Sequence, residues 1–255
     1  MEIMAYFLVA LGASVVGSIS GIGGGVIIKP VLDCIGLLPA STVSFLSGCT
    51  VFAMAVSNMI RNQKSSVALN YQITVFLALG ASIGGIIGKQ IFSGIKENLG
   101  LIQAVLLFLL NLLVFFYVRY KSRICSFHVA NKGVCIAIGL MLGFVSSFLG
   151  IGGGPINIAV LYFFFSMGAK ETARNSLFII LCSQATSLAT TVFANSIPEF
   201  PILALVLMCF GGVAGALIGS EASRKMKNAM VEKLFSCLLI ALIALNVWNI
   251  VKFMA

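Results

Sequence analysis

Apolar residues fill most of the chain in long runs that are separated by short polar intervals. The runs cover roughly residues 3–20, 26–38, 42–60, 67–93 and 98–118, followed by 133–149, 155–168, 172–193, 201–222 and 231–251. Several reach the ~20 residues that an α-helix needs to cross the hydrocarbon core of a bilayer. The pattern predicts an all-α polytopic membrane protein, in which the longest polar interval, 119–132, is a short loop.

The pentapeptide Gly-Ile-Gly-Gly-Gly interrupts this pattern twice, at Gly21–Gly25 and at Gly150–Gly154. A glycine in a helix interior costs about 1 kcal/mol relative to alanine, so four of them in five residues break the helix. At membrane depth every backbone polar group must be satisfied within the protein, so each break is buried or lines a cavity. The segment after each break spans only about 13 residues, or ~20 Å of helix, which is too short to cross. Each break therefore lies in a re-entrant hairpin or between a spanning helix and a short one.

The two breaks belong to two halves of similar sequence. With the spacing that superposes the glycine motifs, Ser47 falls on Ser176. A ladder of glycines at every fourth position, Gly80–Gly88, corresponds to a second ladder, Gly211–Gly219. Small residues with this spacing let membrane helices approach closely, which is the role that we expect of the ladders. The similarity indicates a duplication that covers nearly the whole chain.

The basic residues indicate how the halves are oriented. The formal net charge is +9, but only 9% of the residues are charged, and short loops hold most of the basic ones. The positive-inside rule accounts for this distribution, so no nucleic-acid partner is predicted. If each half crosses the membrane an odd number of times, one side receives Arg61, Lys64, Arg119, Lys121, Arg123, Lys132, Lys170, Arg174, Arg224, Lys225, Lys227 and Lys233. Only Lys89, Lys96 and Lys252 then lie opposite, whereas an even number of crossings would divide the basic loops between the two sides.

We therefore predict two inverted repeats. The first transmembrane repeat is 1–118, the cytoplasmic linker loop is 119–132, and the second transmembrane repeat is 133–255. Each repeat holds a glycine-broken discontinuous or re-entrant helix pair plus three spanning helices. Both termini are predicted to lie outside.

Cofactor and metal chemistry is not indicated. The seven cysteines show no CxxC spacing and lie mostly in apolar runs, and the single histidine, His128, lies in the polar loop without a partner motif. The glycine motif lacks the Gly-Lys-Ser/Thr ending of a P-loop and follows no strand. We expect neither a cofactor, nor a metal site, nor an ATP-driven pump.

The doubled GxGGG break, the length and the two-half layout resemble the TauE/SafE-type sulfite exporter family, also called the sulfonate-uptake permease superfamily. The resemblance covers the whole chain, and its motif residues are Gly21, Gly23, Gly24, Gly25, Gly150, Gly152, Gly153 and Gly154. Pro30 fits a downstream proline of that family, whereas the second half has Ala159 there and carries Pro155 beside its glycines. The resemblance implies a cell-membrane secondary transporter of sulfite, sulfonates or related organosulfur anions, with seven or eight spans.

A sulfur oxyanion needs N–H and O–H donors at a site that can shed water. The breaks supply N–H groups if each opens a short helix whose positive dipole end points at the anion. Polar side chains near the breaks add further donors. The expected substrate-binding residues are Gly21, Gly23, Gly24, Gly25, Ser47, Gly150, Gly152, Gly153, Gly154, Asn157, Arg174, Asn175 and Ser176.

Structural roles compete with several of these assignments. The glycines and serines could serve only helix packing, and Arg174 could extend to the cytoplasm along the helix surface. Lys29 lies within an apolar segment, where an ionisable residue suggests function. Asp33 follows it by four residues, however, and we favour a helix ion pair near the membrane interface.

The sequence thus predicts a secondary transporter that works by alternating access around a midplane site, with a small anionic substrate and the lipid bilayer as partners. An anion channel of the same architecture is the alternative. A membrane-embedded enzyme is the weaker alternative, since the spans contain no cluster of His, Cys, Asp and Glu and no nucleophile–base pair. The oligomeric state is left open, a homo-oligomer included.

The orientation is tested by reporter fusions. A reporter joined to the C-terminus is expected to report an external location, and one inserted in the 119–132 loop a cytoplasmic one, because basic loops stay inside. Cytoplasmic activity of the C-terminal fusion would refute the inverted arrangement.

Overall fold

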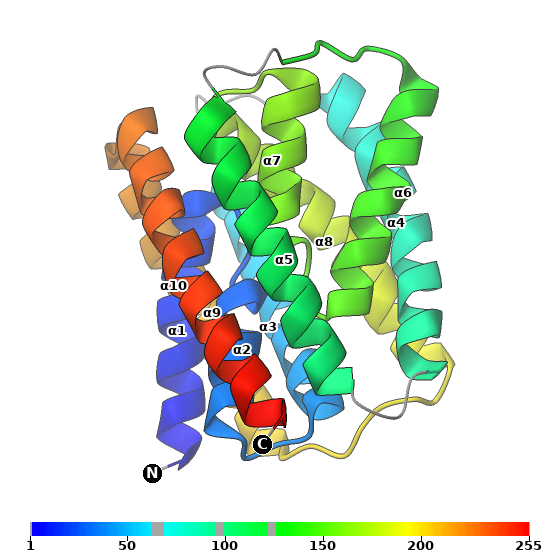
Figure 1. Cartoon of the computed structure of the whole chain (residues 1–255), viewed down its shortest axis with the longest axis vertical. Helices are drawn as coiled ribbons and strands as arrows, with labels where there is room; N and C mark the ends of the chain where they lie inside the picture. Colours follow the sequence, from blue (N-terminus) through cyan, green and yellow to red (C-terminus); the bar gives the residue numbers. More distant parts are fainter. Residues whose placement is uncertain (1, 63–68, 95–98, 122–125, 255) are drawn as a thin grey trace.

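The chain folds into one bundle of α-helices (Figure 1). The computed structural model describes residues 2–62, 69–94, 99–121 and 126–254. In these residues the helices are α1 (Glu2–Ser20), α2 (Gly25–Ile35), α3 (Ala40–Arg61), α4 (Tyr71–Gly94), α5 (Leu99–Tyr120), α6 (Lys132–Leu149), α7 (Gly154–Phe165), α8 (Ala169–Phe193), α9 (Ile202–Lys225) and α10 (Asn228–Met254). The all-α prediction is confirmed, and each expected apolar segment corresponds to one helix. Lys64, Lys96 and Arg123 lie outside the described residues.

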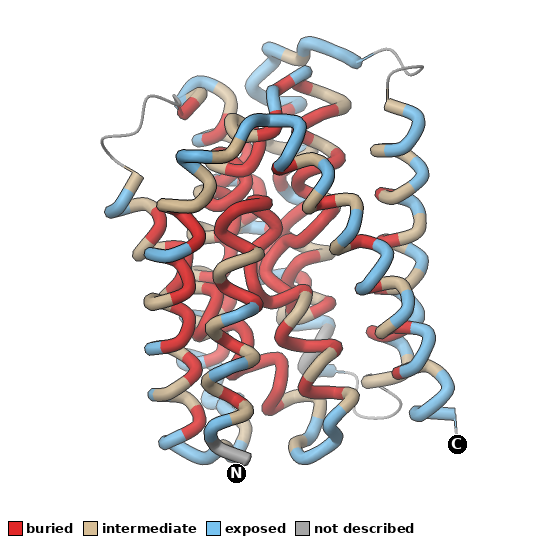
Figure 2. The backbone as a smooth tube through the Cα atoms, turned by 90° about the vertical axis from the view of Figure 1, so that its left-hand side faces the viewer, coloured by how far each residue is buried: buried red, intermediate tan, exposed pale blue. Residues whose placement is uncertain are grey.

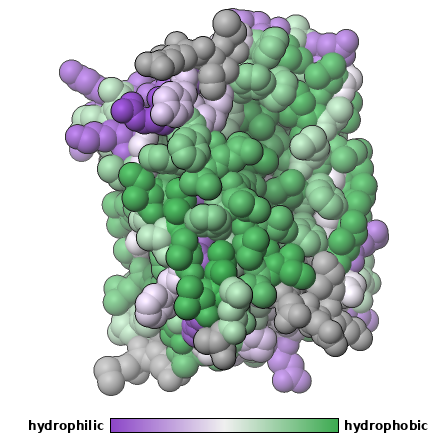
Figure 3. All heavy atoms as spheres, viewed as in Figure 1, coloured by the Kyte–Doolittle hydropathy of each residue, from purple (hydrophilic) through white to green (hydrophobic). Residues whose placement is uncertain are grey.

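Within the described residues, seven helices are long and apolar enough to cross a membrane: α3, α4, α5, α6, α8, α9 and α10. The other helices are shorter in their apolar length, and α2 has only 11 residues and α7 only 12. Large apolar side chains such as Leu113, Phe210 and Trp248 are exposed on the outside of the bundle. Hydrophobic residues cover most of the face seen in Figure 3, as expected of a surface that contacts lipid.

The short helices return to the end of the bundle from which their partners come (Figure 1). α1 starts at the end that carries both chain termini, which we call the termini end, and α2 runs back toward it. α6 starts at the opposite end, and α7 runs back toward that one. Contacts agree, since Lys252 near the C-terminus donates to the carbonyl oxygens of Asp33 and Cys34 at the end of α2. The helix pairs around the breaks are hairpins.

The glycine ladders join the first helix of one half to the fourth helix of the other. A Cβ atom on Gly84 of α4 would lie 2.0 Å from the carbonyl oxygen of Leu140 on α6. A Cβ atom on Gly215 of α9 would lie 2.5 Å from the carbonyl oxygen of Leu11 on α1. The ladders therefore bring helix backbones into direct contact, in agreement with the packing role expected for them.

The helices sort into two packed groups. One group contains α1, α3 and α9, the other contains α6, α8 and α4, and the groups meet along α3 and α8. α2 and α10 pack together at the first group, while α5 packs on both α7 and α10. Burial is greatest in the interior, around the breaks (Figure 2). Each group thus takes two helices from one half of the sequence and one from the other.

Basic side chains gather at the end opposite the termini, which we call the basic end. Arg61 pairs with Glu221 at 3.3 Å, Lys121 pairs with Glu232, and Lys170 donates to the carbonyl oxygen of Arg224 at 3.3 Å. These contacts tie together the ends of α3, α5, α8, α9 and α10. The charge is therefore concentrated at one end of the bundle, as the positive-inside rule requires of a cytoplasmic face.

The tight α4–α6 contact makes Gly84→Ala destabilising. The new methyl group must push two backbones apart, and overpacking of this kind costs about 1–3 kcal/mol. We expect a lower midpoint of thermal unfolding in detergent. The matched control is Gly12→Ala, where a Cβ atom meets nothing within 4 Å, and its midpoint should be unchanged or slightly higher. Equal midpoints for the two variants would contradict the close packing.

Candidate substrate site at the paired glycine breaks

Glycine is required at the breaks because most of their residues have left-handed backbone conformations. In the first break φ is 77° at Gly21 and 82° at Gly23. In the second break φ is positive at Gly150, Gly152, Gly153 and Gly154, reaching 115° at Gly153. Residues with a Cβ atom rarely adopt such angles, whereas glycine does so freely. The breaks are not equivalent, since Gly24 has φ −64° whereas its counterpart Gly153 has φ 115°.

The two breaks contact each other in the buried centre of the bundle. A Cβ atom on Gly25 would lie 2.4 Å from the carbonyl oxygen of Ile151, and one on Gly154 would lie 2.5 Å from Cγ2 of Val26. Ile22, Val26 and Ile151 have at most 1% exposure. The sequence motifs that lie far apart along the chain are therefore adjacent in space.

One side chain from each helix group packs against both breaks. Ile180 of α8 contacts the positions that Cβ atoms would take on Gly23 and Gly153, and Val51 of α3 contacts those of Gly23 and Gly152. Val51 and Ile180 occupy corresponding positions of the two halves. The breaks are thus held at the junction where the two groups meet.

The N-termini of α2 and α7 both face this centre. The N-cap residues are Gly24 and Gly153, and neither helix has a side-chain cap. The first N–H groups of a helix have no intrahelical partner, and the aligned peptide dipoles make this end positive. Because α2 and α7 run in opposite directions from the centre, their positive ends approach each other (Figure 1). A buried anion between them would relieve the repulsion.

Ser176 and Asn175 hold the surroundings of the first break in position. Ser176 Oγ donates to the carbonyl oxygen of Gly21 at 2.7 Å. Asn175 Oδ1 accepts from the backbone N–H of Asn70 at 3.1 Å and from the hydroxyl of Thr74, while Asn175 Nδ2 donates to the helix backbone at 2.7 Å. These hydrogen bonds occupy both polar side chains and connect α8 to α4 and to the break.

Ser47 and Asn157 keep polar atoms without partners. Ser47 is 0% exposed and Asn157 is 1% exposed, and neither Ser47 Oγ nor Asn157 Oδ1 has a hydrogen-bond partner among the described residues. Asn157 lies in the first turn of α7, with its Nδ2 2.5 Å from the Cβ position of Gly153. Arg174 is half-buried and follows Ala173, which contacts Gly21. Ser47 and Asn157 are the expected residues best placed to bind a ligand.

A polar cavity beside the second break contains residues that the sequence did not single out. It lies between α3, α4, α6 and α8, toward the termini end, and is lined by Ser44, Phe45, Gly48, Lys89, Ser147, Gly150, Gln184, Ser187, Leu188 and Thr191. For Lys89 the sequence predicts only a location on the outer side of the membrane and no role in the site. Two other lining residues could have been found by comparing the halves of the sequence. Ser44 and Gln184 are polar, whereas the corresponding residues of the other half, Ala173 and Ala55, are apolar.

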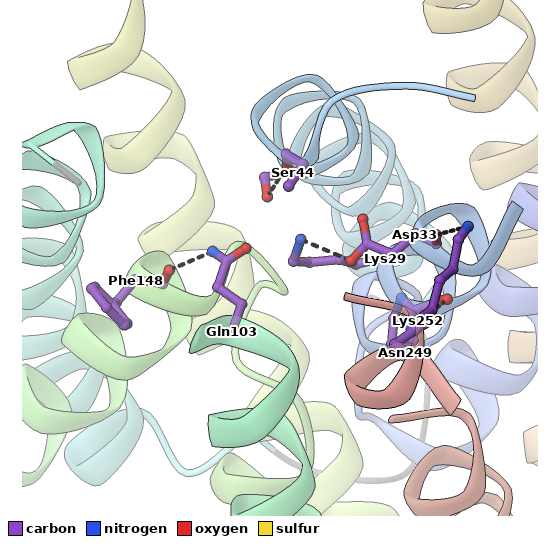
Figure 4. A network of polar contacts seen from close by, with 9 residues as sticks. Lys29, Asp33, Ser44, Gln103, Phe148, Asn249 and Lys252 are labelled. Atoms are coloured by element: carbon purple, nitrogen blue, oxygen red, sulfur yellow. Dashed lines mark hydrogen bonds and ion pairs between the residues drawn. The ribbon is translucent and has the colours of Figure 1, made fainter. Parts of the chain in front are cut away.

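Lys29 and Asp33 form the ion pair expected from their spacing, with Nζ and Oδ2 3.1 Å apart (Figure 4). Lys29 is 0% exposed and surrounded by protein, and the position of the pair near the membrane interface stays a prediction. Asn249 donates to the carbonyl oxygen of Pro30 at 2.9 Å, and Gln103 of α5 donates to that of Phe148 at 2.9 Å. α10 and α5 thereby fix the C-terminal ends of α2 and α6.

A second, wider cavity lies between α4, α5, α6 and α7. Its lining is almost wholly apolar and includes Leu106, Leu113, Phe144 and Phe163. Such a surface offers an anion no compensation for lost hydration. The polar atoms suited to an anion are therefore those at the breaks and in the polar cavity.

The fold and its centre define a polytopic α-helical membrane protein with two glycine-broken helix hairpins. Residues 6–246 match the family model described as sulfite exporter TauE/SafE, so the chain belongs to this family of membrane transporters. The resemblance indicated by the glycine motifs is confirmed, and the protein is a transporter, not an enzyme. It is also similar to the "Probable membrane transporter protein YunE" of Bacillus subtilis (strain 168), with 25% identity over 266 residues that cover 91% of this chain and 93% of the relative. No solved structure matches the chain.

Two corresponding serines are expected to differ in their effect on stability. Ser176→Ala removes the donor to the Gly21 carbonyl oxygen and leaves a buried acceptor unpaired, which costs about 1–3 kcal/mol. Ser47→Ala removes a hydroxyl that has no partner, so the free energy of unfolding should stay the same or rise. Thermal unfolding of both variants in detergent measures the difference. A larger loss for Ser47→Ala would show that the hydrogen bonds at the two breaks are assigned wrongly.

Proposed function

We propose that the protein is a secondary transporter of a small sulfur-containing anion, such as sulfite, a sulfonate or a related organosulfur anion. The observation that carries this proposal is the meeting of two uncapped helix N-termini at the buried centre of a membrane protein. Backbone N–H groups there match the oxygen acceptors of a sulfur oxyanion, and Ser47 and Asn157 add polar atoms. The family's description as sulfite exporters supports the choice of sulfur chemistry.

The two halves, 1–118 and 133–255, act in this proposal as inverted repeats. Three observations support the inversion: the two hairpins enter from opposite ends, the glycine ladders connect corresponding helices crosswise, and the basic residues gather at one end. Discontinuous helices at the interface of inverted repeats are a common way to build a transport site near the bilayer midplane.

Movement of the two helix groups relative to each other provides alternating access. The ladders bind α1 to α9 and α4 to α6 backbone to backbone, so each group moves as a unit. The groups meet along α3 and α8, where Val51 and Ile180 contact the breaks. Rocking at this junction exposes the breaks to one side of the membrane and then to the other. The gradient of the anion itself, or of a coupled ion, supplies the energy.

Purified protein in liposomes tests the function. We expect uptake of labelled sulfite or of a small sulfonate that saturates with concentration and is accelerated by unlabelled anion inside the vesicles. Saturation and counterflow identify a carrier, whereas their absence alongside rapid flux would identify a channel. If sulfite, thiosulfate, sulfate and small sulfonates all fail to move or to stabilise the protein, the substrate assignment is wrong.

The role of the breaks is tested by Gly24→Val. Its backbone has φ −64°, which valine tolerates, and the nearest atom to a Cβ is Ser14 Oγ at 3.2 Å, so insertion should survive. The bulky side chain obstructs the N-terminus of α2, and transport should fall at least tenfold. Gly12→Val in α1, where a Cβ meets nothing within 4 Å, is the control and should transport normally. Normal transport by both variants would exclude the first break from the site.

A further inference from the structure

The polar cavity beside the second break is unusual for its position between membrane-spanning helices. Eight of its ten described lining residues carry a hydroxyl, amide or amine group or are glycines. They are Ser44, Gly48, Lys89, Ser147, Gly150, Gln184, Ser187 and Thr191. A polar cavity at membrane depth is stable only when water or a ligand satisfies its polar atoms. The cavity is narrow and has room for about one water molecule.

An unpaired hydroxyl inside this cavity points to a ligand. Ser147 is 3% exposed, and its Oγ has no hydrogen-bond partner among the described residues. Neighbouring hydroxyls are engaged, since Ser44 donates to the carbonyl oxygen of Ala40 at 2.8 Å and Thr191 donates to that of Ser187 at 2.9 Å. An unsatisfied buried hydroxyl costs about 1–3 kcal/mol, which a bound oxyanion would offset by accepting from it.

The charge of the cavity selects an anion. Among the lining residues that the structure describes, Lys89 is the one charged residue and there is no carboxylate. An ionisable residue in a spanning helix that faces a polar cavity commonly marks an ion pathway. Gln184 extends from the cavity to the break, with its Nε2 2.8 Å from the Cβ position of Gly152. Polar side chains therefore extend from Lys89 to the glycine breaks at the centre of the molecule.

The corresponding serine in the other half is hydrogen-bonded. Ser18 and Asn58 occupy the positions that match Ser147 and Ser187, and Asn58 Nδ2 donates to Ser18 Oγ at 2.7 Å. Ser220 stands where the first half has Lys89. Ser18 thus has a hydrogen-bond partner within the protein, whereas its counterpart Ser147 has none among the described residues.

We infer that Lys89 and Ser147 form a binding station for the transported anion, between the termini end and the glycine breaks. This inference rests on the proposed function, because its ligand is the same small sulfur oxyanion. The Lys89 ammonium supplies the countercharge and the Ser147 hydroxyl donates a hydrogen bond. The narrowness of the cavity means that α3 and α4 separate slightly when the anion enters.

Transport kinetics in liposomes test the station with sulfite as the probe. Lys89→Gln should raise the KM for sulfite at least tenfold through loss of the charge, and Lys89→Arg should restore most of the affinity. Ser147→Ala should raise KM severalfold without lowering the thermal midpoint, since its hydroxyl supports no protein contact. Lys225→Gln removes the same charge from a side chain that is 78% exposed at the basic end, and its KM should stay at the wild-type value.

The outcomes separate this inference from the proposed function. Wild-type transport of sulfite together with unchanged KM in Lys89→Gln and Ser147→Ala overturns the station and leaves the function intact. If Lys89→Gln fails to insert into the membrane, the Ser147→Ala variant tests the station instead. An unchanged KM of this variant for sulfite overturns the station. If the wild type moves no sulfur anion, the proposed function fails. In that case the station is tested by binding alone. Sulfite, sulfate or phosphate should raise the thermal midpoint of the wild type more than that of Lys89→Gln, and an equal rise in both proteins overturns the station.

Discussion

The structure depends on one constraint, which is that exposed backbone polar groups cannot be left in the hydrocarbon of a bilayer. Two glycine-rich breaks leave such groups at the middle of two helix pairs, so both breaks must lie inside the protein. They meet there, with Gly25 against Ile151 and Gly154 against Val26. The remaining helices form the enclosure that this meeting requires. A feature that would be unstable at the surface becomes a set of directed N–H groups once it is enclosed.

The helices that enclose the breaks pack crosswise between the two halves of the sequence. Each glycine ladder places the fourth helix of one half against the first helix of the other, close enough for backbone contact. In the mechanism that we propose, the mobile units are therefore two mixed groups of helices and not the two halves of the sequence. The sequence asymmetry of the halves then gives each group different chemistry, with Lys89, Ser147 and Gln184 beside the second break and the Asn58–Ser18 hydrogen bond in the equivalent place.

Much of this fold could be predicted from the sequence, because the apolar runs and glycine clusters are local signals. All ten segments became helices, and the Lys29–Asp33 pair followed from its spacing. Partner choice between helices was not predictable, since it depends on contacts between residues more than a hundred positions apart, such as Gly215 and Leu11 or Ser176 and Gly21. The cavity beside Lys89 was not predictable for the same reason, because its lining comes from four helices that are separate in the sequence.

The hydrogen bonds that α10 donates to the short helix α2 have a consequence for the order in which the protein assembles in the membrane. Asn249 and Lys252 of α10 supply hydrogen bonds to the backbone of α2, which is synthesised long before them. Gly211–Gly219, which pack on α1, are also synthesised late. The packing of the α1–α2 hairpin is therefore completed only after α9 and α10 have been inserted. Assembly of the central site thus depends on helices that are synthesised after both glycine breaks.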